Sequence, residues 1–264
     1  MTLVLVSVLL YLLATGLLAV ALRRDPAAPM GAWRIPAALA MALHAAVHAM
    51  AWNEVDGPDL HFFAALSLVS LGMAALTIAV ARRERVSALG MLALPLAAAL
   101  LAAYRACGHA GPMALDWRQQ LHATLALLAY ATLAVAALLA VALAVQERAM
   151  RRREFHGWLK TLPPLVQLES LLFRTITVGF ALLTATLLTG VVFVENLFAQ
   201  HLVHKTALSI LSWLAFGALL YGRRRHGWRG AKAVRWTLAA MALLVLAYFG
   251  SKGVLELVLR RPVG

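Results

Sequence analysis

Long apolar runs, separated by shorter polar segments, make up most of the chain. Each run is close to the roughly 20 apolar residues that a helix needs to cross a bilayer core of about 30 Å. The runs cover residues 2–22, 35–52, 61–81, 86–104, 121–146, 174–194, 205–221 and 236–259. This pattern predicts an all-α, polytopic integral membrane bundle of eight transmembrane helices, with residues 1–264 forming a single membrane domain.

The charges sort the connecting segments into two groups. The segments after the first, third, fifth and seventh runs carry 18 of the 24 Lys and Arg residues and a net charge of +13. The remaining segments carry six basic and six acidic residues. Basic residues concentrate in cytoplasmic loops, so the pattern predicts that both the N-terminus and the C-terminus lie outside.

Composition narrows the class of protein. The chain is 63% hydrophobic and only 13% charged, which is far from the composition of a soluble domain. The net charge of +13 arises in loops between spans and gives no reason to expect nucleic acid as a partner. Cys107 is the single cysteine, which excludes internal disulfides and thiolate clusters. HExxH, GxSxG, Walker A and Gly-rich dinucleotide motifs are absent from the sequence, and we expect no enzyme.

The longest connection is the predicted cytoplasmic loop 147–173. It contains Pro163 and Pro164, followed by the amphipathic segment 165–174. Since proline is tolerated in the first turn of a helix, we expect a short interfacial helix after Pro164. We also expect close helix approaches at Thr186, Gly190 and Gly250.

The chain contains nine histidines, which are its most distinctive polar side chains. His156 and His226 fall in basic loops, and the other seven fall toward the predicted outer side. His44, His48, His122 and His204 lie within or at the boundary of the apolar runs, where ionisable groups are costly and indicate function. The alternative for each is a structural histidine that hydrogen bonds across a helix pair.

Neutral imidazoles near a membrane surface suit the ligation of a metal or a haem iron. His44 and His48 share one helix face because they are four residues apart. His122 and His204 begin spans at the same face and are therefore expected at similar depth, as ligation of one iron by both would require. Lys205, Arg118 and Arg105 are the outer-side cations available for haem propionates.

Several segments together carry a family resemblance. They are LHATLALLAYATL (121–133), LLTATLLTGVVFVENLF (182–198), HKTALSILSWLAFGALL (204–220), GWRGAKAVRW (227–236) and LAYFGSK (246–252). This series resembles the CcsA/CcmC/HemX-like family of cytochrome c assembly proteins, and within it the branch of short, YpjD-like inner-membrane members. The resemblance covers about residues 117–255.

The resemblance implies a location in the bacterial inner membrane and haem handling at its outer face. Larger members carry a Trp-rich segment between the helices that match the sixth and seventh spans, and present haem there to apocytochrome c. In this chain the short segment VENLFAQHLVHK (194–205) stands there and has no Trp. The resemblance carries the role of axial ligand over to His122.

The sequence therefore favours a non-catalytic, haem-handling accessory protein of cytochrome c assembly. His122 is the expected first axial ligand of haem b, and His204 is the expected second, with His44 or His48 as its substitute. Lys205 is the expected propionate partner. The expected partners are the lipid bilayer, haem, and an apocytochrome or other assembly proteins. The alternatives are a membrane scaffold or regulatory subunit that keeps the fold without haem, and an accessory protein of ion transport.

Topology gives the first testable prediction. A reporter that is active only outside the cytoplasm, fused after Gly264, is expected to be active, because the charge asymmetry places this terminus outside. The same reporter placed in the loop 147–173 is the matched control and should be inactive. Activity of a strictly cytoplasmic reporter at Gly264 would contradict the predicted orientation.

Overall fold

The protein is a helical bundle. The computed structural model describes residues 1–24, 31–54, 58–83, 87–107, 115–153, 162–193 and 200–253. Its elements are α1 (Thr2–Arg24), α2 (Arg34–Glu54), α3 (Phe62–Arg83), η1 (Ser87–Leu89), α4 (Gly90–Ala106), α5 (Trp117–Arg151), α6 (Leu165–Phe193), α7 (Gln200–His226), α8 (Gly230–Val245), η3 (Leu246–Gly250) and α9 (Ser251–Gly253).

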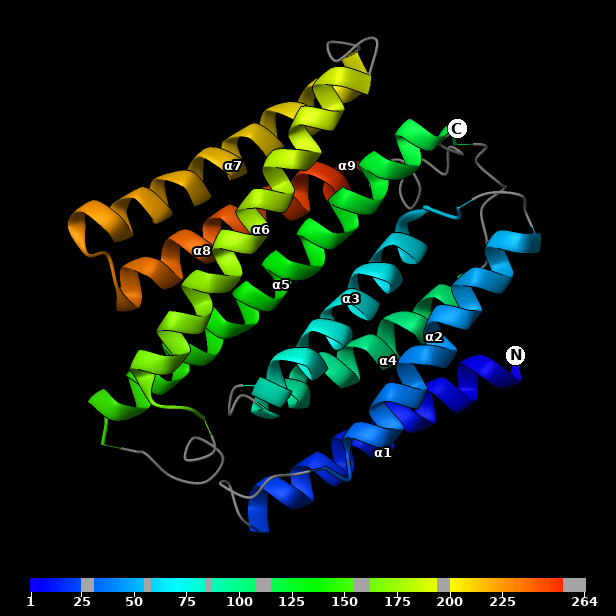
Figure 1. Ribbon diagram of the computed structural model, residues 1–264, viewed down its shortest axis with the longest axis horizontal. Coiled ribbons are helices and arrows are strands. Elements are labelled where there is room, and N and C mark those ends of the chain that lie inside the picture. The colour runs from blue at the N-terminus through cyan, green and yellow to red at the C-terminus, as the bar shows by residue number, and fades with distance from the viewer. Residues whose placement is uncertain are drawn as a thin grey trace.

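Eight long apolar helices in the described ranges are candidate membrane spans, the last formed by α8, η3 and α9 together. They confirm the predicted all-α membrane fold. Figure 1 shows the helices running alternately up and down, so that α1, α3, α5 and α7 begin at the same end of the bundle. We call this the outer end, following the predicted orientation.

The bundle consists of two halves that meet along α5. In the first half α1 packs against α2 and α4, and α3 packs against α4. In the second half α5 packs against α6 and α8, and α7 packs against α6 and α8. Contacts between α3 and α5 join the halves (Figure 1). The largest cluster of buried apolar side chains lies around α5.

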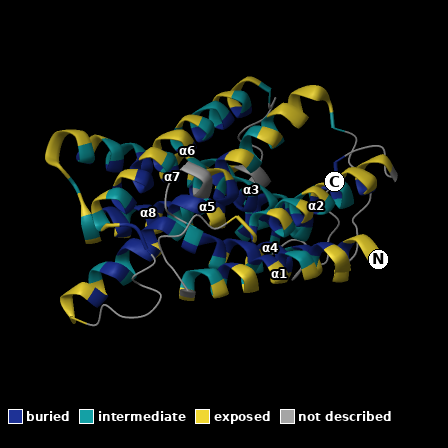
Figure 2. Cartoon of the chain, turned by 60° about the horizontal axis from the view of Figure 1, so that its bottom comes forward, coloured by how far each residue is buried: buried dark blue, intermediate teal, exposed yellow. Residues whose placement is uncertain are grey.

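The outer surface of the bundle is apolar. Figure 2 shows buried residues gathered along the inward faces of the helices and exposed residues along the outward faces. Leu9 and Leu13 of α1 are exposed, as are Leu188 and Val192 of α6. A soluble protein rarely exposes so much contiguous apolar surface, whereas a membrane protein presents it to lipid.

Helix α6 differs from the prediction. It begins at Leu165, directly after Pro164, whose carbonyl accepts hydrogen bonds from the amides of Gln167 and Leu168. It then runs without interruption to Phe193. The amphipathic segment 165–174 is therefore the first part of α6, not a separate interfacial helix, since Leu168, Leu171 and Leu172 are buried against the bundle. Residues 154–161 of the predicted loop lie outside the described residues.

A buried carboxylate ties three helices together at the inner end. Glu169 of α6 accepts hydrogen bonds from Arg223 of α7, at 2.7 Å, and from Arg229 before α8, at 3.1 and 3.2 Å. Arg223 also lies over the ring of Phe173. These hydrogen bonds replace the ones to water that the Glu169 carboxylate loses when it is buried.

Small residues allow α5 to approach its neighbours closely. A Cβ atom built on Gly72 of α3 would lie 2.7 Å from the Cβ of Ala131 on α5. On the other side of α5, a Cβ at Gly179 of α6 would lie 2.5 Å from Cδ2 of Leu133. Helices in membranes often associate through such small residues, which let two backbones come close.

Adding a single methyl group at Gly72 is expected to push α3 away from α5. The Cβ of Ala131 has no rotamer that would relieve the contact, so Gly72→Ala should lower the free energy of unfolding by about 1–3 kcal/mol. Unfolding in mixed detergent and SDS micelles measures this loss. Gly16→Ala is the matched control, because a Cβ at Gly16 meets nothing within 4 Å. Equal stability of the two variants would contradict the close α3–α5 packing.

Candidate functional site

His122 lies near the outer end of α5. The side chain of Asp116 caps this helix by accepting a hydrogen bond from the amide of Trp117, so α5 begins at Trp117 and His122 lies in its second turn. The half-buried imidazole faces α6. A Cβ built on Gly190 would lie only 3.3 Å from Cε1 of His122, which confirms the predicted close approach at Gly190.

The hydrogen-bond partners of His122 favour one of the two tautomers of its ring. Nδ1 of His122 lies 3.0 Å from Oγ1 of Thr189. The hydroxyl of Thr189 donates its own hydrogen to the carbonyl of Thr186. With its hydrogen on that carbonyl, Thr189 accepts from the ring, an arrangement that favours Nδ1 of His122 as the protonated nitrogen and leaves the lone pair on Nε2. A second-shell hydrogen bond of this kind orients histidines that ligate metals.

Two cavities meet at His122. The larger one, which we call the His122 cavity, has a volume of about 680 Å³. Its apolar walls come from α3, α5 and the C-terminal span, and its cations are Arg118, Lys205 and Lys252. A neighbouring hollow of about 290 Å³ shares His122, Lys205 and other walls with it. A volume of this size is typical of sites for small molecules and cofactors.

A π-helical turn shapes one wall of the His122 cavity. The turn η3 carries Tyr248 and Phe249, and both side chains line the cavity. Tyr248 donates a hydrogen bond to the carbonyl of Leu60 at 3.1 Å, and the ammonium group of Lys252 donates to the same carbonyl. These contacts fasten the end of the last span to the start of α3. Single π-helical turns occur often at functional sites.

The structure brings together some of the predicted site residues. Lys205 and Arg118 line the His122 cavity, as a propionate partner would have to. His204, one residue before Lys205, is exposed on α7 and lines neither cavity. Arg105 is exposed at the end of α4 and is not in the cavity lining. His204 as the second ligand therefore stays a prediction that these cavities do not support.

His44 is buried in the first half of the bundle and forms two hydrogen bonds there. Its Nδ1 lies 3.3 Å from the hydroxyl of Tyr11, and its Nε2 lies 2.8 Å from Oγ of Ser67. Nε2 of His48 lies 2.9 Å from the same Oγ. Both ring nitrogens of His44 are thus used in hydrogen bonding across helices, which is the structural alternative that the sequence left open.

A second group of polar residues continues this network toward the outer end. The ring of Tyr104 stacks between those of His48 and His61, with centroids 4.6 and 5.6 Å away. The carboxylate of Asp59 lies 2.5 Å from Nδ1 of His61 and accepts a hydrogen bond from Tyr104 at 3.4 Å. All four side chains are buried. The network thus links α2, α4 and the segment before α3.

Sequence reasoning missed most partners of these histidines. Thr189 and Ser67 carry no sequence signal, because Thr and Ser are common in membrane helices and only the fold brings them to His122 and to His44. Lys252 lies within the resemblance segment 246–252, and its charge near the end of an apolar run was the available signal. Across the described ranges, no group of three or more His, Cys, Asp or Glu residues could hold a metal ion.

The fold and the cavity together define the class of protein. This is a multi-pass membrane protein with a histidine-containing cavity at one end of its helix bundle. The family model described as "Cytochrome C assembly protein" matches residues 32–259. The chain belongs to the cytochrome c assembly protein family.

Three relatives illustrate the similarity. Inner membrane protein YpjD of Escherichia coli K12 is 34% identical over 240 residues, covering 86% of this chain and 89% of the relative. An uncharacterized 28.8 kDa protein of Azospirillum brasilense is 36% identical over 141 residues, covering 53% of this chain and 52% of the relative. Cytochrome c biogenesis protein CcsA of Prochlorococcus marinus is 34% identical over 86 residues, covering 32% of this chain and 27% of the relative. No solved structure matches the chain.

Ser67 gives a prediction for the buried network. Ser67→Ala removes the shared partner of His44 and His48 and should cost about 1–3 kcal/mol of unfolding free energy for each nitrogen left unsatisfied. Ser70→Ala is the matched control, because the Ser70 hydroxyl donates only to the carbonyl of Ser67 three residues earlier. Unfolding in SDS and detergent should show the larger loss for Ser67→Ala. A loss no greater than that of the control would rule out the shared hydrogen bonds.

Proposed function

We propose that this protein binds haem b at the His122 cavity and acts as a haem-handling accessory protein in cytochrome c assembly, without turnover chemistry of its own. The observation that carries the proposal is the state of His122. The contact with Thr189 favours the proton on Nδ1, which leaves the lone pair on Nε2, and His122 lines a cavity of about 680 Å³. That nitrogen is a suitable axial ligand for iron.

The residues present fit the chemistry of a haem. A haem ring needs apolar walls, and the cavity provides Val69, Phe193 and Phe249. Its two propionates need cations, and Arg118, Lys205 and Lys252 lie in the same lining. Among the described residues, Nε2 of His122 has no hydrogen-bond partner that ligation would have to displace. The fit thus rests on the donor set, not on the family relationship alone.

Different side chains of the cavity would hold different parts of the haem. Bound haem would supply an iron that accepts a nitrogen lone pair and two carboxylates that need cations. His122 would donate the lone pair, and Thr189 would keep the imidazole oriented. Lys205 and Lys252 would pair with the carboxylates, while the apolar walls would exclude water from the site.

The site lies at the outer end of the bundle, where a haem could be passed to an apocytochrome or to another assembly protein. The family membership supports this role, and the name of the relative CcsA refers to cytochrome c biogenesis. His204 directly precedes Lys205, which lines the cavity, and a separate experiment below tests His204 as the second ligand. A scaffold that keeps the fold without haem is the competing function, and the two differ in visible absorption.

Haem titration of the purified protein gives the test. The wild type is expected to develop a Soret band that saturates at one haem per chain, and His122→Ala is expected to lose it. Thr189→Val should weaken haem binding by about 10–100-fold, because removal of second-shell partners costs that much in metal sites. His226→Ala is the matched control, since His226 is exposed at the inner end and should behave as wild type.

His204→Ala separates one-histidine from two-histidine ligation. We expect this variant to keep its Soret band, because the His204 side chain is exposed and lines neither cavity. Loss of the band in His204→Ala would establish His204 as the second ligand. A wild type without a saturable band, or a His122→Ala variant with an unchanged one, would overturn the proposed function.

A further inference from the structure

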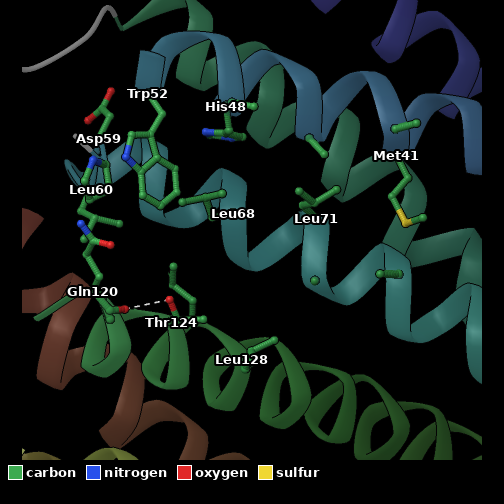
Figure 3. A pocket seen from close by; sticks show the side chains of 18 residues that line it. Met41, His48, Trp52, Asp59, Leu60, Leu68, Leu71, Gln120, Thr124 and Leu128 are labelled. Atoms are coloured by element: carbon green, nitrogen blue, oxygen red, sulfur yellow. Dashed lines mark hydrogen bonds between the residues drawn. The ribbon is translucent and has the colours of Figure 1, made fainter. Parts of the chain in front are cut away.

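A further cavity lies on the opposite side of α5 from α6, between α2, α3 and the outer half of α5. We call it the lateral slot. Its volume is about 570 Å³, and Figure 3 shows it from close by. Trp52, Asp59, Leu60 and Gln120 lie at one end of the slot, and Met41 lies at the other (Figure 3). The distance along α2 from Met41 to Trp52 is about 16 Å at the rise of an α-helix, so the slot is elongated.

The slot opens toward the lipid phase. Ala42, Ala45 and Ala49 on α2 line it and are exposed, as is Leu128 on α5 across from them. These residues lie within helices long and apolar enough to span the membrane. A ligand can therefore enter from the bilayer, and its apolar part can lie between Met41 and Leu71.

The charge of the lining separates the slot from the His122 cavity. None of the residues that line it in the described structure is Lys or Arg. A phospholipid phosphate or a haem propionate would find no cation there, whereas Arg118, Lys205 and Lys252 offer three in the His122 cavity. The slot therefore suits a neutral amphipathic molecule.

Polar groups stand on both sides of the outer end of the slot. His48 and Asp59 line it from α2 and from the segment before α3. Gln120 and Thr124 line it from α5 on the other side (Figure 3). Their positions suit a flat ring that carries hydrogen-bonding oxygens on two opposite edges. Trp52 adds an aromatic surface at the same end.

The polar end of the slot is connected to the buried network. His48 shares Ser67 with His44, and His44 reaches Tyr11. The Ser67 hydroxyl can donate its single hydrogen to either imidazole. The hydrogen bonds that link Tyr11, His44, Ser67 and His48 can therefore all form with their donors pointing in either direction along the network. This suits a ligand whose oxygens exchange between hydrogen-bond donors and acceptors.

From this combination we infer that the lateral slot binds an isoprenoid p-quinone or its quinol. The ring would lie at the Trp52 end between His48 and Gln120, and the isoprenoid tail would lie along the alanine face of α2. The oxygens of a quinone accept hydrogen bonds and the hydroxyls of a quinol donate them. Gln120 donates one amide hydrogen to the carbonyl of Leu115 and has a second to offer, and Thr124, whose hydroxyl donates to the carbonyl of Gln120, can accept. This inference concerns a different cavity from that of the proposed function.

Photolabelling of the full chain tests the inference. The protein is placed in phosphatidylcholine nanodiscs that contain no quinone and is labelled with an azido-ubiquinone, and the labelled peptides are identified by mass spectrometry. Labels are expected on slot residues of α2, α3 or α5 and should be displaced by decylubiquinone. Ala45→Trp fills the slot and should reduce labelling there about tenfold or more. Leu39→Trp is the matched control, because Leu39 is exposed on α2 but lies outside the slot.

A second variant and two competitors keep the result interpretable. Gln120→Leu keeps an apolar slot and removes one polar edge, so it should also reduce labelling if Ala45→Trp fails to fold. Displacement of the label by phosphatidylglycerol but not by decylubiquinone would make the slot an acyl-chain groove and overturn the inference. Labelling spread over the lipid-facing surface, equal in wild type and variants, or crosslinks between two copies at the slot, would overturn it as well. Haem titration of the same samples reports on the His122 site independently.

Discussion

The close packing of α5 between α3 and α6 is the constraint on which the rest of the structure depends. At Gly72 and Ala131 there is no room for one more methyl group, and Gly179 has a similar contact with Leu133. Without a hydrophobic effect between helices in lipid, such close contacts supply much of the association energy. Since α5 contributes walls to both the His122 cavity and the lateral slot, its position sets the shape of both. Leu60, Ala123 and Leu127 even belong to both linings.

A second constraint explains why the histidines have different roles. Within a membrane each polar group needs an internal partner. His44 meets this demand with both of its ring nitrogens, and so it serves as part of a buried network. His122 meets it with Nδ1 alone, and the contact with Thr189 favours that nitrogen as the donor. The same physical rule therefore gives one histidine a structural role and leaves the other available for a ligand.

Periodicity and hydropathy were sufficient to predict the eight spans, because the length of an apolar run is a direct record of bilayer thickness. The close helix approach at Gly190 was also expected, and Lys205, the expected propionate partner, lines the His122 cavity. The sequence did not predict that α6 continues unbroken from Leu165, because an amphipathic segment can either lie on the membrane or pack on a bundle. It also missed Ser67 and Thr189, whose contacts are 19 or more residues away along the chain and depend on how helices pack.

The most direct test of haem ligation by His122 is the position of the iron in a crystal of the haem-loaded protein, located by anomalous scattering at the iron absorption edge. If His122 ligates the iron, a single strong peak is expected in the His122 cavity. It should lie about 2 Å from Nε2 of His122, as is typical of metal–imidazole bonds, with Nδ1 still in contact with Thr189. A peak beside Nδ1 of His122, a peak between His44 and His48, or no ordered iron in the cavity would contradict it.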